Sequence, residues 1–130
     1  YTRGLQEKES KQSEKHLVER VRQTDSEDAF ERVRQAYSAY RKGVEALRGQ
    51  SYQEALERFR KAAELNPTHV LAWNNAGTVL MNNFDSLDEA RKAFEAGLEM
   101  EPLPILQMNL QKAAEAMSIQ ERKSKRKKRE

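Results

Sequence analysis

The sequence has no cysteine and few of the residues that interrupt helices. Five glycines and three prolines are spread over 130 residues, so long helices are permitted. The absence of cysteine excludes disulfides and thiolate chemistry, and it favours a reducing intracellular compartment such as the cytoplasm, the nucleus or an organelle interior. No window approaches the roughly 18 apolar residues of a transmembrane helix, so we expect no membrane span.

Residues that carry catalysis or bind metals are also scarce. The two histidines, His16 and His69, have no Cys or carboxylate partner at metal-ligand spacing, and there is no glycine-rich loop. Asp85, Asp88 and Glu89 form a cluster, but helix capping accounts for it. We therefore expect no enzymatic activity, no cofactor and no metal.

The net charge of +3 conceals an uneven distribution. Residues 122–129, "RKSKRKKR", carry seven of the 24 basic residues, and the rest of the chain holds 17 basic against 21 acidic residues. A mildly acidic body and a strongly basic end indicate separate roles for the two parts.

Apolar periodicity predicts an all-α fold. A short amphipathic helix is expected near residues 12–23, and Thr24–Asp28 offers the capping oxygens and acidic residues of a new helix start. From there the chain runs to Gly49 without a breaker, with apolar side chains at steps of three and four residues: Phe30, Val33, Tyr37, Tyr40, Val44 and Leu47.

Four more helices follow after turns. They are expected at Tyr52–Leu65, at about 69–82 with Thr68 as the N-cap, from Asp85 or Ser86 to about Met100, and at about 104–121. Ser86 and Glu89 have the spacing of a capping box. Pro67 and Pro102 each follow a helix and end it.

A pattern of small and large residues occurs twice. Ala55, Phe59, Ala62 and Pro67 have the same spacing as Ala90, Phe94, Gly97 and Pro102, which lie 35 residues later. Self-similarity at this period indicates a helix–turn–helix repeat. The chain resembles the tetratricopeptide repeat (TPR) family over residues 36–121, at positions Trp73, Ala76, Gly77, Leu80, Ala90, Phe94 and Pro102, with Gly97 in place of the usual late alanine.

The resemblance implies a superhelix of two repeats with a capping helix. We expect a charged N-terminal extension at residues 1–25, a TPR-like domain at 26–121 and a basic tail at 122–130. Small residues such as Gly43 and Gly77 would let the paired helices approach, and large ones such as Phe59 and Phe94 would fill the spaces beside them.

The implied function is protein–protein interaction, as an adaptor or a structural subunit of a larger complex. A partner segment, either a helix or an extended peptide, would bind in the concave groove. The groove residues predicted from the family pattern are Tyr37, Tyr40, Val44, Leu71, Asn74, Asn75, Thr78 and Met81.

The apolar ridge of Tyr37, Tyr40, Val44 and Leu47 has a second interpretation, as core. The first helix could be rotated by one residue relative to the family pattern, or residues 12–23 could fold back over the ridge. Exposed, the ridge is large enough to be a binding surface.

One TPR subclass clamps the acidic C-terminal tails of chaperones, and the resemblance to it is limited to Asn75. Where that subclass needs lysine, asparagine or arginine, this chain has Tyr40, Val44, Leu106 and Leu110. Without those polar side chains a terminal carboxylate has few donors, so we expect no chaperone-tail clamp.

The basic tail has three interpretations: an RNA contact in a ribonucleoprotein, a nuclear import signal, or the solvated end of the last helix. No aromatic residue lies among its cations, so an RNA contact would be electrostatic and indifferent to sequence. The residues concerned are Arg122, Lys123, Lys125, Arg126, Lys127, Lys128 and Arg129.

Overall fold

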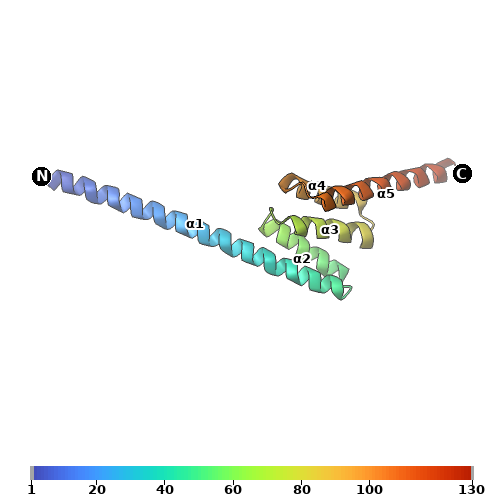
Figure 1. Cartoon of the computed structure of the whole chain (residues 1–130), viewed down its shortest axis with the longest axis horizontal. Coiled ribbons are helices and arrows are strands. Elements are labelled where there is room, and N and C mark those ends of the chain that lie inside the picture. The colour runs from blue at the N-terminus through green and yellow to red at the C-terminus, as the bar shows by residue number, and fades with distance from the viewer. Residues whose placement is uncertain (1, 130) are drawn as a thin grey trace. The chain divides into compact units, whose positions relative to one another are not determined.

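The protein is built of helices. A computed structural model describes the backbone of residues 2–129 and the side chains of residues 25–129. Five α-helices follow in chain order (Figure 1): α1 (Thr2–Arg48), α2 (Tyr52–Leu65), α3 (Val70–Asn83), α4 (Leu87–Met100) and α5 (Pro104–Arg129). Between residues 2 and 129 there is no strand. The all-α fold expected from the sequence is confirmed.

The chain divides into two compact units, one ending at Arg34 and the other beginning at Gln35. In the first unit the described side chains, residues 25–34, are all exposed. They include two large apolar side chains, Phe30 and Val33. The second unit holds the end of α1 and all of α2 to α5, and it contains the core and the surfaces discussed below.

α1 is one helix where the sequence predicted two. The helix start expected at Thr24–Asp28 is wrong, because α1 continues through these residues. No glycine or proline lies between Gly4 and Gly43, so nothing in the backbone forces an interruption. The alternative in which residues 12–23 cover the ridge concerns side chains outside the described residues.

The later helices lie close to their predicted positions. α2 has the expected bounds, and α3 and α4 agree with the prediction to within about one residue. α5 differs, since it continues past residue 121 to Arg129. The cations of its last turn favour this extension, because they complement the negative end of the helix dipole. The domain boundaries predicted after residues 25 and 121 fall inside α1 and α5, and they stay predictions.

The predicted Thr68 cap and the predicted capping box are wrong, whereas Ser86 is an N-cap as predicted. The hydroxyl of Thr68 donates to Asn66 Oδ1 at 2.6 Å, and His69 caps α3 instead, with its Nδ1 accepting from Ala72 N at 3.3 Å. Ser86 is the N-cap of α4, but it makes no side-chain capping bond. The capping box with Glu89 is absent because Glu89 accepts from Arg60 on α2, at 2.9 Å.

Equivalent turns close the two helix pairs. Gln50 and Asp85, 35 residues apart, both have positive φ, at 61° and 53°. Asn66 and Glu101, also 35 residues apart, both leave the second helix of a pair with extended backbone, and their N–H groups donate back to the helix at 2.9 and 3.0 Å. The repeat period seen in the sequence therefore holds for the backbone as well.

Glycines set how closely the paired helices pack. A Cβ atom placed on Gly43 would lie 2.6 Å from Phe59 Cε1, and one placed on Gly77 would lie 2.5 Å from Phe94 Cε1. Both phenylalanines are fully buried. Because Gly43 packs on Phe59 as Gly77 packs on Phe94, the alternative in which the first helix is rotated by one residue is wrong.

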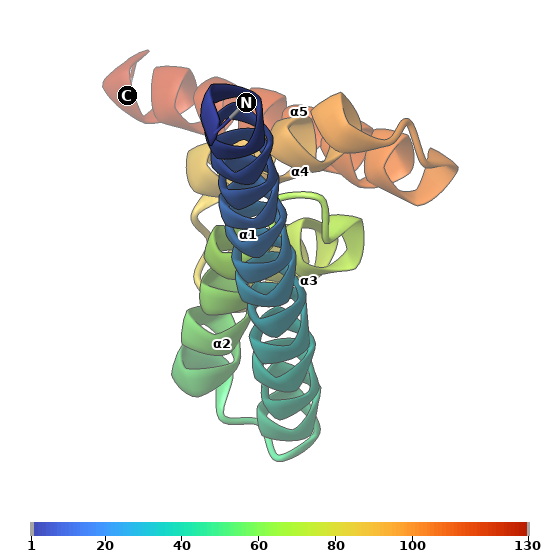
Figure 2. The same ribbon diagram turned by 90° about the vertical axis from the view of Figure 1, so that its left-hand side faces the viewer.

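The helices form two antiparallel pairs and a single last helix. α3 contacts both α2 and α4, and α4 contacts α5 (Figures 1 and 2). The end of α1 packs on α2 through Gly43 and Phe59. Paired helices with glycine-on-phenylalanine contacts at a repeat period confirm the TPR-like fold.

α5 presents polar side chains where a further pair would pack. Gln107 and Gln111 follow Trp73 and Gly77 by 34 residues, and Trp73 and Gly77 face α4. Both glutamines are exposed. A polar outer face is what a terminal helix of a repeat array needs, so α5 acts as the capping helix expected from the sequence.

We expect Gly77→Ala to destabilise the domain by about 1–3 kcal/mol, because the added methyl group overlaps the buried ring of Phe94. Urea unfolding followed by circular dichroism measures the loss. Gly49→Ala is the matched control, since its new Cβ would lie 3.6 Å from the nearest atom, Ala46 O. Equal stabilities of the two variants would contradict the packing described above.

Candidate partner-binding surface

One exposed apolar side chain occurs at the same place in α1, α3 and α5. Tyr37, Leu71 and Ile105 follow one another at steps of 34 residues and are 57%, 46% and 44% exposed. We call these three residues the exposed row. Since equivalent positions of a repeat array face the same side, the row lies across the first helices of the array. Met108, one turn after Ile105, is 49% exposed and extends it.

The groove residues predicted from the sequence differ in accessibility. Tyr37 and Leu71 are exposed, and Asn74 is buried. The others are half-buried: Tyr40, Val44, Asn75, Thr78 and Met81. Tyr40, Val44 and Met81 also pack against the core, as Leu47 does. Both interpretations of the ridge therefore hold in part. Tyr37 is exposed, whereas Tyr40, Val44 and Leu47 are half-buried and contribute to both the core and the surface.

A chain of hydrogen bonds links the three first helices. Asn109 on α5 donates to Asn74 Oδ1 at 2.7 Å, Asn74 donates to Asn75 Oδ1 at 3.5 Å, and Asn75 donates to the Tyr40 hydroxyl at 3.3 Å. We call this chain the amide relay. Asn74 and Asn109 are both buried, so their mutual bond offsets the cost of removing two amides from water. Asn74 is thus largely covered, and its side chain joins α5 to Asn75 beneath the surface.

The rest of this region is also held in place. Thr78 donates its hydroxyl proton to Asn74 O at 2.8 Å. The Tyr40 ring lies against two others, with centroid distances of 5.8 Å to Phe59 and 4.7 Å to His69. These contacts fix the Tyr40 side chain, so its hydroxyl is positioned before any partner arrives.

α3, in the centre of this surface, has no charged residue. Two positions at which chaperone-tail binders carry cations hold leucines in this chain. Leu106 is fully buried, and Leu110 packs against the core. The surface therefore offers apolar contacts together with neutral hydrogen-bonding groups. The expectation that it does not clamp a chaperone tail stays a prediction.

The contribution of α5 to the exposed row was not predicted from the sequence. Ile105 and Met108 were not among the predicted residues, because the prediction covered only the two complete repeats. The signal was present in the regular 34-residue spacing of Tyr37, Leu71 and Ile105. Asn109 was missed too, and its pairing with Asn74 depends on a contact between helices.

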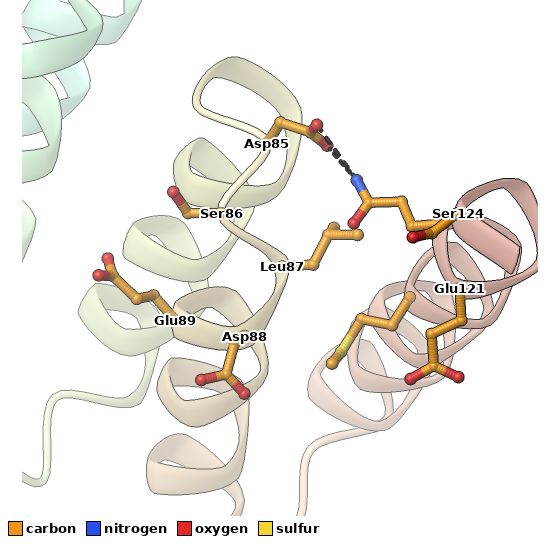
Figure 3. A pocket seen from close by; sticks show the side chains of 9 residues that line it. Asp85, Ser86, Leu87, Asp88, Glu89, Glu121 and Ser124 are labelled. Atoms are coloured by element: carbon orange, nitrogen blue, oxygen red, sulfur yellow. Dashed lines mark hydrogen bonds between the residues drawn. The ribbon is translucent and has the colours of Figure 1, made fainter. Parts of the chain in front are cut away.

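The second half of α5 lies beside the start of α4. Figure 3 shows a notch between them, whose lining residues include Asp85, Asp88, Glu121 and Ser124. Gln120 donates to both oxygens of Asp85, at 3.1 Å each. A hydrogen bond from Lys92 holds the pKa of Asp88 below its ordinary value. Among the described residues, no cluster of histidines, cysteines and carboxylates could hold a metal ion.

The basic residues at positions 122–129 are all exposed and belong to α5. Gln120, Glu121 and Ser124 point to the notch, so the opposite face of this helix is directed away from α4 (Figure 3). In the part of the chain with described residues, no helix has an apolar stretch sufficient to cross a bilayer.

A comparison with curated proteins finds a relative in an archaeon. The chain is 39% identical to the uncharacterized protein MJ0572 of Methanocaldococcus jannaschii over 71 residues, which are 55% of this chain and 81% of the archaeal protein. The chain belongs to the same family as this archaeal protein. No family model matches the chain.

A comparison with solved structures finds the first TPR of Spaghetti (RPAP3), solved bound to the HSP90 peptide SRMEEVD. The identity is 19% and the TM-score is 0.43, over 66% of this chain and 95% of that chain.

We expect the stability of the domain to fall as the pH drops through about 6.5. Burial lowers the pKa of His69 below its ordinary value of 6.5, with a backbone hydrogen bond opposing the shift in part. The unfolded chain therefore binds the proton more readily, and the stability present above pH 6.5 is lost as the pH falls toward the folded pKa. The loss of stability should not exceed about 1 kcal/mol, the typical contribution of one N-cap. Protonation removes this cap, because a protonated Nδ1 cannot accept a hydrogen bond from Ala72 N.

Urea unfolding at pH 7.5 and 5.5 measures this loss, with His69→Asn as the control. Asparagine caps a helix without titrating in this range. Both proteins keep His16, so the comparison isolates the change at position 69. An equal loss of stability in the two proteins would show that His69 does not titrate as described.

Proposed function

We propose that the protein is a non-catalytic interaction module, an adaptor or a structural subunit of a larger complex. A protein segment binds across the first helices of its repeats. The observation that carries the proposal is the exposed row, in which Tyr37, Leu71 and Ile105 present a large apolar side chain at the same position of three successive helices. Apolar surface exposed in a regular array is typical of a binding site.

The amide relay supports the same function. Tyr40 and Asn75 are half-buried at the base of this surface, and their side chains are already oriented by each other and by Asn74. A binding surface that is ordered before binding loses less conformational entropy when the partner arrives. The contact residues we propose are Tyr37, Tyr40, Val44, Leu71, Asn75, Thr78, Met81, Ile105 and Met108.

We expect Leu71→Ser to reduce the recovery of partner proteins about fivefold or more, because it removes a central apolar contact. The measurement is affinity capture of the tagged chain from its native extract after nuclease treatment, with the bound proteins quantified by mass spectrometry. Met100→Ser is the matched control. Met100 is 47% exposed and Leu71 is 46% exposed, but Met100 lies at the end of α4, away from the row. If both variants recover the same proteins in the same amounts, the proposed surface is wrong.

A second candidate function is an RNA contact in a ribonucleoprotein, made by the basic end of α5. The observation that favours it is the run of seven exposed cations at residues 122–129. Such a contact would neutralise phosphates and read no bases, since the run contains no aromatic residue.

If the basic end binds RNA, its affinity for a single-stranded homopolymer should fall about 10³-fold between about 50 and 200 mM salt, as expected for some seven neutralised phosphates. Fluorescence anisotropy measures this dependence. Deleting residues 122–130 should abolish the binding, while Leu71→Ser should leave it unchanged. Affinity that does not respond to salt would argue against an RNA contact.

A further inference from the structure

All of the large exposed apolar residues of α5 lie on one line along the helix. Ile105, Met108 and Ile119 are 44–50% exposed, and they are separated by steps that return to the same face of a helix. Lys112, Arg122, Lys123 and Arg126 lie on the same face, within about 100° around the helix axis. We call these seven residues the α5 stripe. It faces away from the notch, where Gln120, Glu121 and Ser124 lie (Figure 3).

The stripe is mainly apolar as far as Ile119 and basic beyond it. Ile105 and Met108 continue the exposed row onto α5, Lys112 is the one cation before Ile119, and the end of the stripe consists of cations, all exposed. The one acid on this face, Glu115, accepts a hydrogen bond from Gln111 at 3.3 Å. Apolar residues therefore predominate in the first part of the stripe, and only cations follow Ile119.

This serial order favours one kind of partner. A bilayer surface is matched by a helix with an apolar face and basic flanks along its whole length, which α5 lacks. RNA is matched by cations together with aromatic side chains on which bases stack, and the stripe has no aromatic residue. A protein segment can match the two halves separately, because its sequence can be apolar at one end and acidic at the other.

We propose that the partner segment has an apolar half and an acidic half. The apolar half covers Ile105 and Met108, where the exposed row reaches α5, and the acidic half lies along Arg122, Lys123 and Arg126. The apolar half of the segment rests on the proposed function, whereas the acidic half does not. A partner helix of about 20 residues spans about 30 Å, which is enough to cover the stripe from Ile105 beyond Ile119.

The test uses the full chain as bait for a phage-displayed library of random peptides about 20 residues long, a helical length of about 30 Å. We expect the enriched peptides to carry apolar residues in one half and acidic residues in the other. The strongest of them is then measured by fluorescence anisotropy against two variants. The stripe variant is Arg122→Gln, Lys123→Gln and Arg126→Gln. The control variant is Lys125→Gln, Lys127→Gln and Lys128→Gln, which removes the same charge from positions outside the stripe.

The stripe variant should bind the peptide about tenfold more weakly, the effect of losing three exposed ion pairs, and the control variant should change less than about twofold. Equal weakening by both variants would overturn the proposal, because it indicates attraction to the net charge alone. Circular dichroism of both variants checks that α5 remains helical.

Other outcomes separate the two proposals. Enriched peptides that are apolar without acidic residues, and that lose affinity with Leu71→Ser, would overturn this inference and leave the proposed function standing. A library that yields no enriched peptide would count against both. Binding of the chain to anionic phospholipid vesicles or to a homopolymer RNA that is stronger than its binding to the best peptide would overturn the inference in favour of that ligand.

Discussion

The packing of two phenylalanine rings on glycine backbone determines the rest of the structure. Phe59 and Phe94 are fully buried, and each fills the space that a side chain at Gly43 or Gly77 would occupy. This contact brings the helices of each pair close together and fixes their rotation. It therefore decides which side chains of α1 and α3 face outward. On α5 the same is done by Leu106, which packs against Gly97 of α4, and together these contacts position the exposed row. Without the close approach, the row would not be aligned across three helices.

The amide relay adds order to a surface that packing alone would leave partly apolar. The Asn74–Asn109 bond buries two amides between α3 and α5, and Asn75 carries the connection to Tyr40 on α1. Apolar contacts are non-directional, whereas hydrogen bonds need a defined geometry. The relay thus specifies one relative placement of the first helices, and the core supplies most of the stabilisation.

Much of the fold could be predicted from the sequence because local signals agreed with one another. The bounds of α2 and the position of Gly43 on Phe59 followed from spacing alone. The caps were harder to predict, because Thr68 and His69 are adjacent and the local backbone decides which of them accepts the N–H. The continuity of α1 was not predicted, because residues that suit a helix start, such as Thr24–Asp28, can also lie inside a longer helix. At the candidate site, the burial of Asn74 depends on Asn109 in another helix, and no local pattern contains that information.

The order of contacts along the chain has a consequence for how the domain folds and opens. Side-chain hydrogen bonds between helices join residues that are 29 or 35 positions apart, as in Arg60–Glu89 and Asn74–Asn109. Each helix thus contacts only the next one or two helices along the chain, a topology that folds rapidly because few distant segments must meet. α3 and α4 have partners on both sides, while α1 and α5 end the array. Amide hydrogen exchange should accordingly be slowest in α3 and α4, and the domain should open from its ends.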